Sequence, residues 1–90
     1  MEHVEELHVL EHLGFVLECL AEDVRGEAKS ELGSLARALE SDKRYAIAGA
    51  QERAHKLSEA LMLLRGDDAR GAAAILARVS RELWKRVLSG

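Results

Sequence analysis

The chain has 90 residues, a net charge of −3, 48% apolar residues and 32% charged residues. This length predicts one domain over residues 1–90, and the composition is that of a folded soluble protein. The acidic beginning does not resemble a secretory signal peptide, and no apolar run approaches the roughly 18 residues of a membrane helix. We therefore expect a cytoplasmic protein that does not bind a membrane.

The residue types favour helices throughout. The sequence contains no Pro, Asn or Thr, and Ala, Leu, Glu and Arg dominate. These four are good helix formers, and none is enriched in strands. The single cysteine, Cys19, rules out an intrachain disulfide. Few amides beside many Glu and Arg residues match thermophile proteins, so we expect a thermophilic source, with helix bias alone as the alternative explanation.

The first predicted helix covers residues 3–24. Its apolar positions recur mostly at steps of three and four and form one wide face: Leu7, Val9, Leu10, Leu13, Val16, Leu17, Leu20, Ala21 and Val24. Such a wide face is typical of a helix in a bundle. We expect Arg25-Gly26 to end this helix, with Gly26 in the left-handed C′ position and Arg25 at the negative end of the helix dipole.

The second predicted helix is shorter and covers residues 27–40. Its apolar stripe consists of Ala28, Leu32, Leu35, Ala36 and Leu39. The pair Ser41-Asp42 predicts a break, because either side chain can cap a new helix. A continuous helix over residues 27–65 is the alternative.

The third predicted helix covers residues 43–65 and carries the most regular apolar seam of the chain. The seam alternates steps of three and four: Ile47, Ala50, Ala54, Leu57, Leu61 and Leu64. Residues between the seam positions, among them Glu52, Arg53 and Lys56, should face solvent. Gly66-Asp67 predicts the end of this helix, with Asp67 as the N-cap of the next one.

The fourth predicted helix covers residues 68–88 and is basic. Its apolar face consists of Ala69, Ala72, Ala73, Leu76, Val79, Leu83 and Val87. Trp84 lies on the flank of this face. Arg78, Arg81 and Lys85 form the opposite side, which should be solvated.

These four helices predict an all-α, up-down four-helix bundle. Connections of about two residues make sequential helices antiparallel neighbours. The short second helix cannot cover the full length of the first and third helices, so apolar surface would remain bare in a single chain. We therefore expect self-association into a homodimer or a larger assembly, with another protein as the alternative partner.

One side of the first helix carries the residues that we predict to form this contact. His8, His12, Phe15 and Cys19 fall within a narrow band away from the main apolar face. An aromatic ring flanked by His and Cys suits a helix–helix contact, and an isologous dimer would join two first helices around Phe15. A second candidate surface contains Met62, Leu63 and Trp84.

Charge is unevenly distributed along the chain. Residues 1–24 hold seven acidic side chains and no Lys or Arg, whereas residues 69–90 hold five basic side chains against Glu82 alone. We expect the acidic first helix to lie near the basic fourth helix, within one chain or between chains. The alternative is a nucleic-acid-binding surface formed by Arg78, Arg81, Lys85 and Arg86.

Two histidines in the first helix have the spacing of metal ligands. His8 and His12 lie four residues apart, and Glu5 or Glu11 could add an oxygen to a zinc or iron site. The simpler interpretation is a polar helix side without a metal. Glu52 and His55 share the spacing of ligands in di-metal bundles, but they lie off the seam and should face water.

No residue pattern indicates catalysis. The serines lack the context of an activated nucleophile, Cys19 has no base predicted beside it, and the glycines form no phosphate-binding loop. We therefore predict a non-catalytic oligomerisation or protein-interaction module without a cofactor. A nucleic-acid-binding regulator and a small metal-binding helical protein are the two alternatives.

Overall fold

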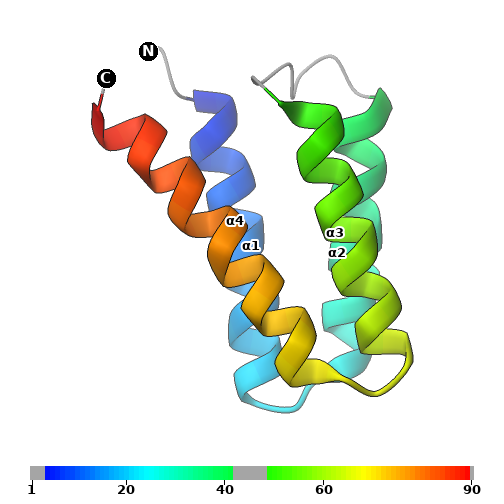
Figure 1. Ribbon diagram of the computed structural model, residues 1–90. Helices are drawn as coiled ribbons and strands as arrows, with labels where there is room; N and C mark the ends of the chain where they lie inside the picture. Colours follow the sequence, from blue (N-terminus) through cyan, green and yellow to red (C-terminus); the bar gives the residue numbers. More distant parts are fainter. Residues whose placement is uncertain (1–3, 42–48, 90) are drawn as a thin grey trace.

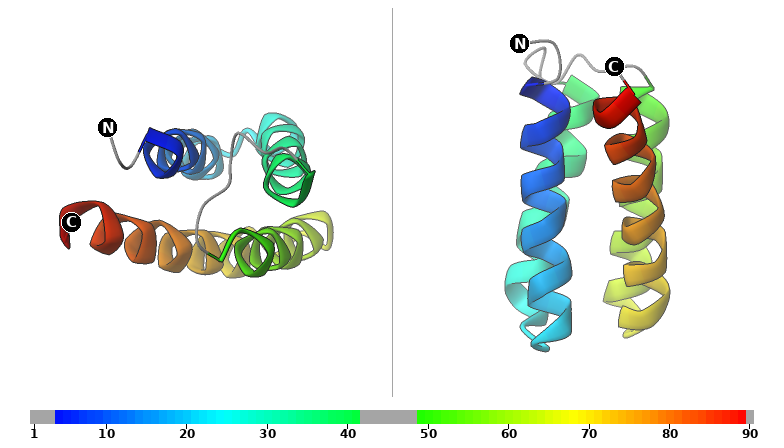
Figure 2. Two further views of the ribbon diagram at one scale, coloured as in Figure 1. Left: turned by 90° about the horizontal axis from the view of Figure 1, so that it is seen from above. Right: turned by 90° about the vertical axis from the view of Figure 1, so that its left-hand side faces the viewer.

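The computed structural model describes residues 4–41 and 49–89, which form four α-helices. The helices are α1 (Val4–Ala21), α2 (Arg25–Ser41), α3 (Ala50–Arg65) and α4 (Ala69–Ser89). They run alternately up and down, and α1 and α3 each pack against both α2 and α4 (Figure 1 and Figure 2). The predicted all-α, up-down four-helix bundle is confirmed. Over the described ranges, no helix has the length and apolar character needed to cross a bilayer.

An apolar core fills the centre of this ring of helices. The predicted stripe of α2 is buried throughout, and so are the seam positions of α3 from Ala54 onward. The buried apolar residues are Val9, Leu10, Leu13, Val16, Cys19, Ala28, Leu32, Leu35, Ala36, Leu39, Ala54, Leu57, Ala60, Leu61, Leu64, Ala72, Leu76, Val79 and Leu83. Ile47, the first predicted seam residue, lies outside the described residues.

The buried side of α1 is rotated from the predicted one. Leu17 and Leu20 are only partly buried and Val24 is 39% exposed, whereas Cys19 is 6% exposed and belongs to the core. The prediction that Cys19 lies away from the apolar face of this helix is therefore wrong. The physical reason is that α2 packs against this side of α1 and covers the thiol.

The turn between α1 and α2 corrects the predicted end of the first helix. α1 ends at Ala21, and Asp23 rather than Gly26 takes the left-handed conformation, with a φ of 60°. The amide of Asp23 and that of the next residue donate to carbonyls in the last turn of α1, at 3.2 and 2.8 Å, which is a Schellman motif. Arg25 and Gly26 therefore begin α2 instead of ending α1.

The turn between α3 and α4 repeats this arrangement. Asp67 has a φ of 67°, and the amides of residues 67 and 68 donate to carbonyls in the last turn of α3, at 3.1 and 2.8 Å. Gly66 keeps a right-handed conformation with a φ of −86°. Asp68 rather than Asp67 caps α4, because its Oδ1 accepts a hydrogen bond of 2.9 Å from the Gly71 amide.

Helix α2 is not the short helix that the sequence predicted. It has 17 residues, against 18 in α1, 16 in α3 and 21 in α4, because it already begins at Arg25. The prediction that α2 leaves α1 and α3 undercovered is therefore wrong. The length of α2 therefore gives no reason to expect self-association.

Helices α2 and α3 are separate, side-by-side elements. α2 ends at Ser41 as predicted, and Gly49, with a φ of 72°, precedes α3. The alternative of one continuous helix over residues 27–65 is therefore wrong (Figure 1). The predicted two-residue connection between these helices falls in residues 42–48, outside the described residues. The predicted start of the third helix, at residues 43–48, lies outside the described residues.

Candidate interaction surfaces

Helices α1 and α4 lie side by side as one layer of the bundle. The outer face of this layer is the side of each helix that contacts neither the core nor α2 or α3. The side of α1 that meets α2 is marked by His12, whose Nδ1 lies 2.5 Å from Oε1 of Glu31. The side of α4 that meets α3 is marked by Ile75 and Glu82, which line a groove between these helices. Because successive residues turn by about 100° around a helix, the residues away from these contacts and from the core point outward. The right-hand view of Figure 2 shows this layer, with α1 and α4 in front.

The α4 part of this face carries an apolar pair beside basic residues. Trp84 is 45% exposed and Leu88 is 79% exposed, and they lie four residues apart on one side of the helix. The same side continues from Trp84 towards the start of α4 through Arg81, Ala77 and Arg70, at spacings of three, four and seven. We name these five residues the α4 stripe.

The α1 part of the face is acidic. Its outward residues are spaced by three and four, and we name them the α1 stripe: Val4, Leu7, Glu11, Gly14, Glu18 and Ala21. Glu11 and Glu18 are exposed, and a Cβ on Gly14 would meet nothing within 4 Å. The outer face of the layer therefore places an acidic helix beside a basic one and leaves open space next to Gly14.

The two charged helices also meet inside the bundle. Glu6 of α1 is 6% exposed, and its Oε2 lies 3.9 Å from Nε of Arg86 on α4. Helices α1 and α4 are neighbours over much of their length. The prediction that the acidic first helix lies near the basic last one is therefore confirmed within a single chain.

His8, His12 and Phe15 lie on a different side of α1, towards α2. Together with Glu31 and with Glu11 at its border, they line a shallow hollow, in which Phe15 is 43% exposed. Across residues 4–41 and 49–89, no group of three His, Cys, Asp or Glu side chains is arranged to hold a metal ion. The alternative of a metal site at His8 and His12 therefore gains no further ligands from the described part of the chain.

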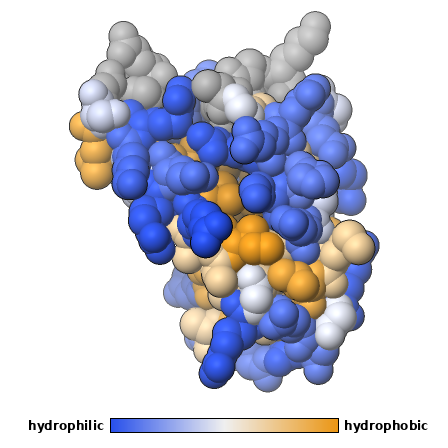
Figure 3. Space-filling view, in the orientation of Figure 1, coloured by the Kyte–Doolittle hydropathy of each residue, from blue (hydrophilic) through white to orange (hydrophobic). Residues whose placement is uncertain are grey.

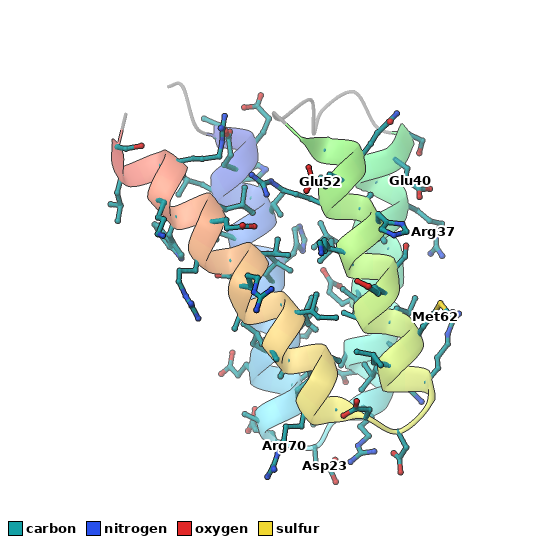
Figure 4. The ribbon with its side chains drawn as sticks, viewed as in Figure 1. Asp23, Arg37, Glu40, Glu52, Met62 and Arg70 are labelled. Atoms are coloured by element: carbon teal, nitrogen blue, oxygen red, sulfur yellow. The ribbon has the colours of Figure 1, made fainter. Side chains whose placement is uncertain are left out.

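The other predicted contact residues are scattered over the molecule. Cys19 is buried, and burial raises the pKa of its thiol above the ordinary value of 9.0. Met62 is 70% exposed on α3, and Figure 4 shows its side chain pointing away from α4. Leu63 is partly buried and packs against the core. The second predicted surface, with Met62, Leu63 and Trp84, is thus not brought together, and Cys19 is separated from His8, His12 and Phe15 by its burial.

Three of the four basic residues predicted as a nucleic-acid surface share one exposed side of α4. Arg78, Arg81 and Lys85 follow one another at spacings of three and four, and all three are exposed. Arg78 also lines the groove between α3 and α4, whereas Arg86 is turned towards α1, with its Nε 3.9 Å from Oε2 of Glu6. The nucleic-acid surface therefore stays a prediction.

A groove of about 300 Å³ lies between α3 and α4. Its lining combines five charged with three apolar side chains: Glu52, Arg53, Lys56, Ala74, Ile75, Arg78, Val79 and Glu82. Figure 3 shows apolar surface between charged side chains on the face formed by these two helices. The expectation that Arg53 faces solvent is wrong, because α4 covers it and leaves its side chain only 15% exposed.

Two features of these surfaces were missed from the sequence. The spacing of four between Trp84 and Leu88 was a visible signal for an exposed apolar pair, whereas the burial of Arg53 had no signal, because it depends on how α4 crosses α3. Comparisons with protein-family models, with curated proteins and with solved structures find no match for this chain. Its function is therefore inferred from these surfaces alone.

Proposed function

We propose that this chain is a non-catalytic module that forms a homodimer through the outer face of the α1/α4 layer. The observation that carries this proposal is the adjacent pair Trp84 and Leu88, which are 45% and 79% exposed on α4. Tryptophan and arginine, which lie next to each other here as Trp84 and Arg81, are among the residue types most enriched where proteins make energetically important contacts. Phe15, by contrast, shares its hollow only with charged and polar side chains.

Charge determines how a second copy would dock on this face. Both chains of a homodimer present the same face, with acidic α1 beside basic α4 (Figure 2). A two-fold axis parallel to the helices places α1 of each chain opposite α4 of the other chain. An axis perpendicular to the helices would instead oppose the two acidic α1 stripes, and juxtaposed like charges are costly. The first arrangement is therefore the one that we propose.

The order of residues along the helices supports this arrangement. α1 begins and α4 ends at the same end of the bundle (Figure 1), so heights can be compared from that end. With a rise of about 1.5 Å per residue, Leu7 and Trp84 lie about 5 and 8 Å from it, and Glu11 and Arg81 lie about 10 and 12 Å from it. An axis parallel to the helices leaves these heights unchanged. Leu7 would then face the partner's Trp84, and Glu11 would face the partner's Arg81.

Burial of this face would add to a small core. A chain of this length buries a modest share of its surface, so a second apolar contact contributes usefully at about 25 cal/mol per Å², before the entropy cost of association. The acidic residues of the α1 stripe and the basic residues of the α4 stripe would contribute less affinity than the apolar pair, but they would set the orientation of the two chains. The proposed role is thus to bring two copies together in one defined geometry.

Sedimentation equilibrium at micromolar concentration tests this proposal. The wild-type chain should be a dimer, and Trp84→Glu should release monomers, because it places a carboxylate in the apolar contact. Met62→Glu is the matched control, since Met62 is also exposed but lies on α3, away from this face. A monomeric wild-type chain, or equal effects of the two substitutions, would contradict the proposal.

A further inference from the structure

We propose that the groove between α3 and α4 binds a small organic monoanion, namely a carboxylate that carries a short apolar chain. The volume of the groove, about 300 Å³, is at the lower end of the range for small-molecule sites. Its α4 residues lie on the α3 side of that helix, next to the α4 stripe rather than within it, so the groove is not part of the contact proposed for the homodimer. The two proposals are therefore independent of each other.

The charges in the groove select the sign of the ligand. Three basic side chains, those of Arg53, Lys56 and Arg78, share the groove with two carboxylates, those of Glu52 and Glu82. One positive charge of this lining is left without a counterpart. A single negative charge would balance the site, whereas a dianion would leave an excess of negative charge.

Arg53 is the side chain that gains most from an anionic ligand. Its Nε is buried and has no hydrogen-bond partner among the described residues. Its Nη1 lies 3.8 Å from Oε1 of Glu82, which is too far for a hydrogen bond. Buried polar nitrogens in native proteins are almost always paired, so this guanidinium needs a further acceptor. A carboxylate offers two oxygens in the planar geometry that the guanidinium fork prefers.

The apolar part of the lining defines the rest of the ligand. Ala74, Ile75 and Val79 come from one side of α4 and lie among the charged groups of the groove. Ile75 also packs against the core, so it provides a firm apolar wall. An aliphatic chain that removes water from this wall should bind about threefold to fourfold more tightly for each buried methylene. Inorganic phosphate has no such chain and carries more than one negative charge, so it fits less well.

NMR titration of the isotope-labelled full chain with butyrate, hexanoate and inorganic phosphate tests this inference. Hexanoate should cause saturable shifts at groove residues and bind about tenfold more tightly than butyrate, because it buries two further methylenes. Phosphate should bind more weakly than either. The shifts of Trp84 and Leu88, which lie on α4 away from the groove-lining side, should stay small.

Two substitutions identify the groups that bind the carboxylate. Arg53→Gln and Arg78→Gln each remove one cation from the groove and should weaken hexanoate binding at least about tenfold. Circular dichroism would detect whether Arg53→Gln disturbs folding. Arg78 is exposed, so Arg78→Gln should leave the fold unchanged and can test the binding by itself. Arg37→Gln is the matched control, since it removes an equal charge from α2, where Figure 4 shows the side chain on the far side from α4.

Four results would overturn the inference. These are the absence of saturable shifts in the groove, equal affinities for butyrate and hexanoate, phosphate binding as tight as that of hexanoate, and equal weakening by Arg37→Gln and Arg78→Gln. Saturable hexanoate binding that only the groove substitutions weaken would support it.

Discussion

Arg25, the first residue of α2, forms an ion pair through its Nη1 with Oδ1 of Asp67, in the turn between α3 and α4. Its Nε donates a hydrogen bond of 2.8 Å to Oδ1 of Asp23, in the turn between α1 and α2. Both aspartates are the left-handed residues of their Schellman motifs. One guanidinium thus connects two helix ends, although 42 positions separate Arg25 from Asp67.

Replacing Asp67 by glycine should show how the left-handed backbone and the ion pair compare in energy. The left-handed conformation costs an L-residue roughly 1–2 kcal/mol, a cost that glycine avoids. Glycine also raises the entropy of the unfolded chain, which destabilises the folded state by about 0.4–1 kcal/mol. In an Arg25→Gln background, Asp67→Gly should therefore stabilise the chain by about 0.5–1 kcal/mol. In the wild-type background the gain should be smaller, because an exposed ion pair worth up to about 1 kcal/mol is lost. Urea melts would measure both values, and destabilisation in both backgrounds would contradict this account.

The core of α3 allows a direct test of which side of that helix is buried. Leu57 is 0% exposed, so Leu57→Ala should lower the free energy of unfolding by about 2–5 kcal/mol. Glu52 is exposed at the mouth of the groove, and Glu52→Ala should change it by less than about 0.5 kcal/mol. Comparable losses in denaturant melts would show that the buried side is assigned wrongly.

The helical stripes could be predicted from the sequence because they follow from local spacing. The stripe of α2 and the seam of α3 from Ala54 onward are buried as predicted, and Ala50 is partly buried against the core. The helix ends were less predictable, because aspartate takes the C′ position at Asp23 and Asp67 although glycine is preferred there. Because Gly26 was expected to end the first helix, the second helix was predicted to be too short. The predicted reason for self-association depended on that length.

The surfaces were harder to predict than the core, because they depend on which helices become neighbours. Helical projection placed Cys19 beside Phe15, but it could not show that α2 covers one of the two and leaves the other 43% exposed. Arg53 likewise becomes largely buried only because α4 packs beside it. Residue spacing on one helix therefore predicts what can share a side, whereas the packing of the helices decides what that side contacts.

Cys19 should make the stability of the chain more dependent on pH in the alkaline range. Burial raises the pKa of its thiol above 9.0, and nearby carboxylates raise it further: Glu27, Glu18, Glu22 and Glu31. The unfolded chain then loses this proton at a lower pH than the folded chain does. The contribution of the thiol to stability is therefore fully present below the ordinary thiol pKa of 9.0 and is lost as the pH rises towards the folded pKa.

Denaturant melts between about pH 7 and pH 10 would measure this effect. The free energy of unfolding should fall more steeply with pH for the wild-type chain than for Cys19→Ala, which lacks the thiol. Other groups that titrate in this range are present in both chains and cancel in the comparison. Parallel pH profiles would contradict the assigned burial of the thiol.

Exchanging charges between Glu11 and Arg81 tests the proposed two-fold arrangement most directly. In a homodimer of Arg81→Glu chains, the new carboxylate would face the partner's Glu11 at each of the two equivalent contacts. In a homodimer of Glu11→Arg chains, the new guanidinium would face the partner's Arg81. Each variant should dimerise more weakly than the wild-type chain. In an equal mixture of the two variants, both contacts of a heterodimer would again pair opposite charges, so heterodimers should dominate.

This mixing experiment separates contacts between chains from contacts within a chain. If Glu11 and Arg81 interacted only within their own chain, the mixture would associate no better than the separate variants. Exposed ion pairs contribute about 0.2–1 kcal/mol each, so restoring two contacts should tighten association by about twofold to thirtyfold over the separate variants. Energy transfer between differently labelled variants would report heterodimers, and added salt should weaken their preference, because exposed charges are screened. A mixture without heterodimers would exclude an axis parallel to the helices, even if the wild-type chain is a dimer.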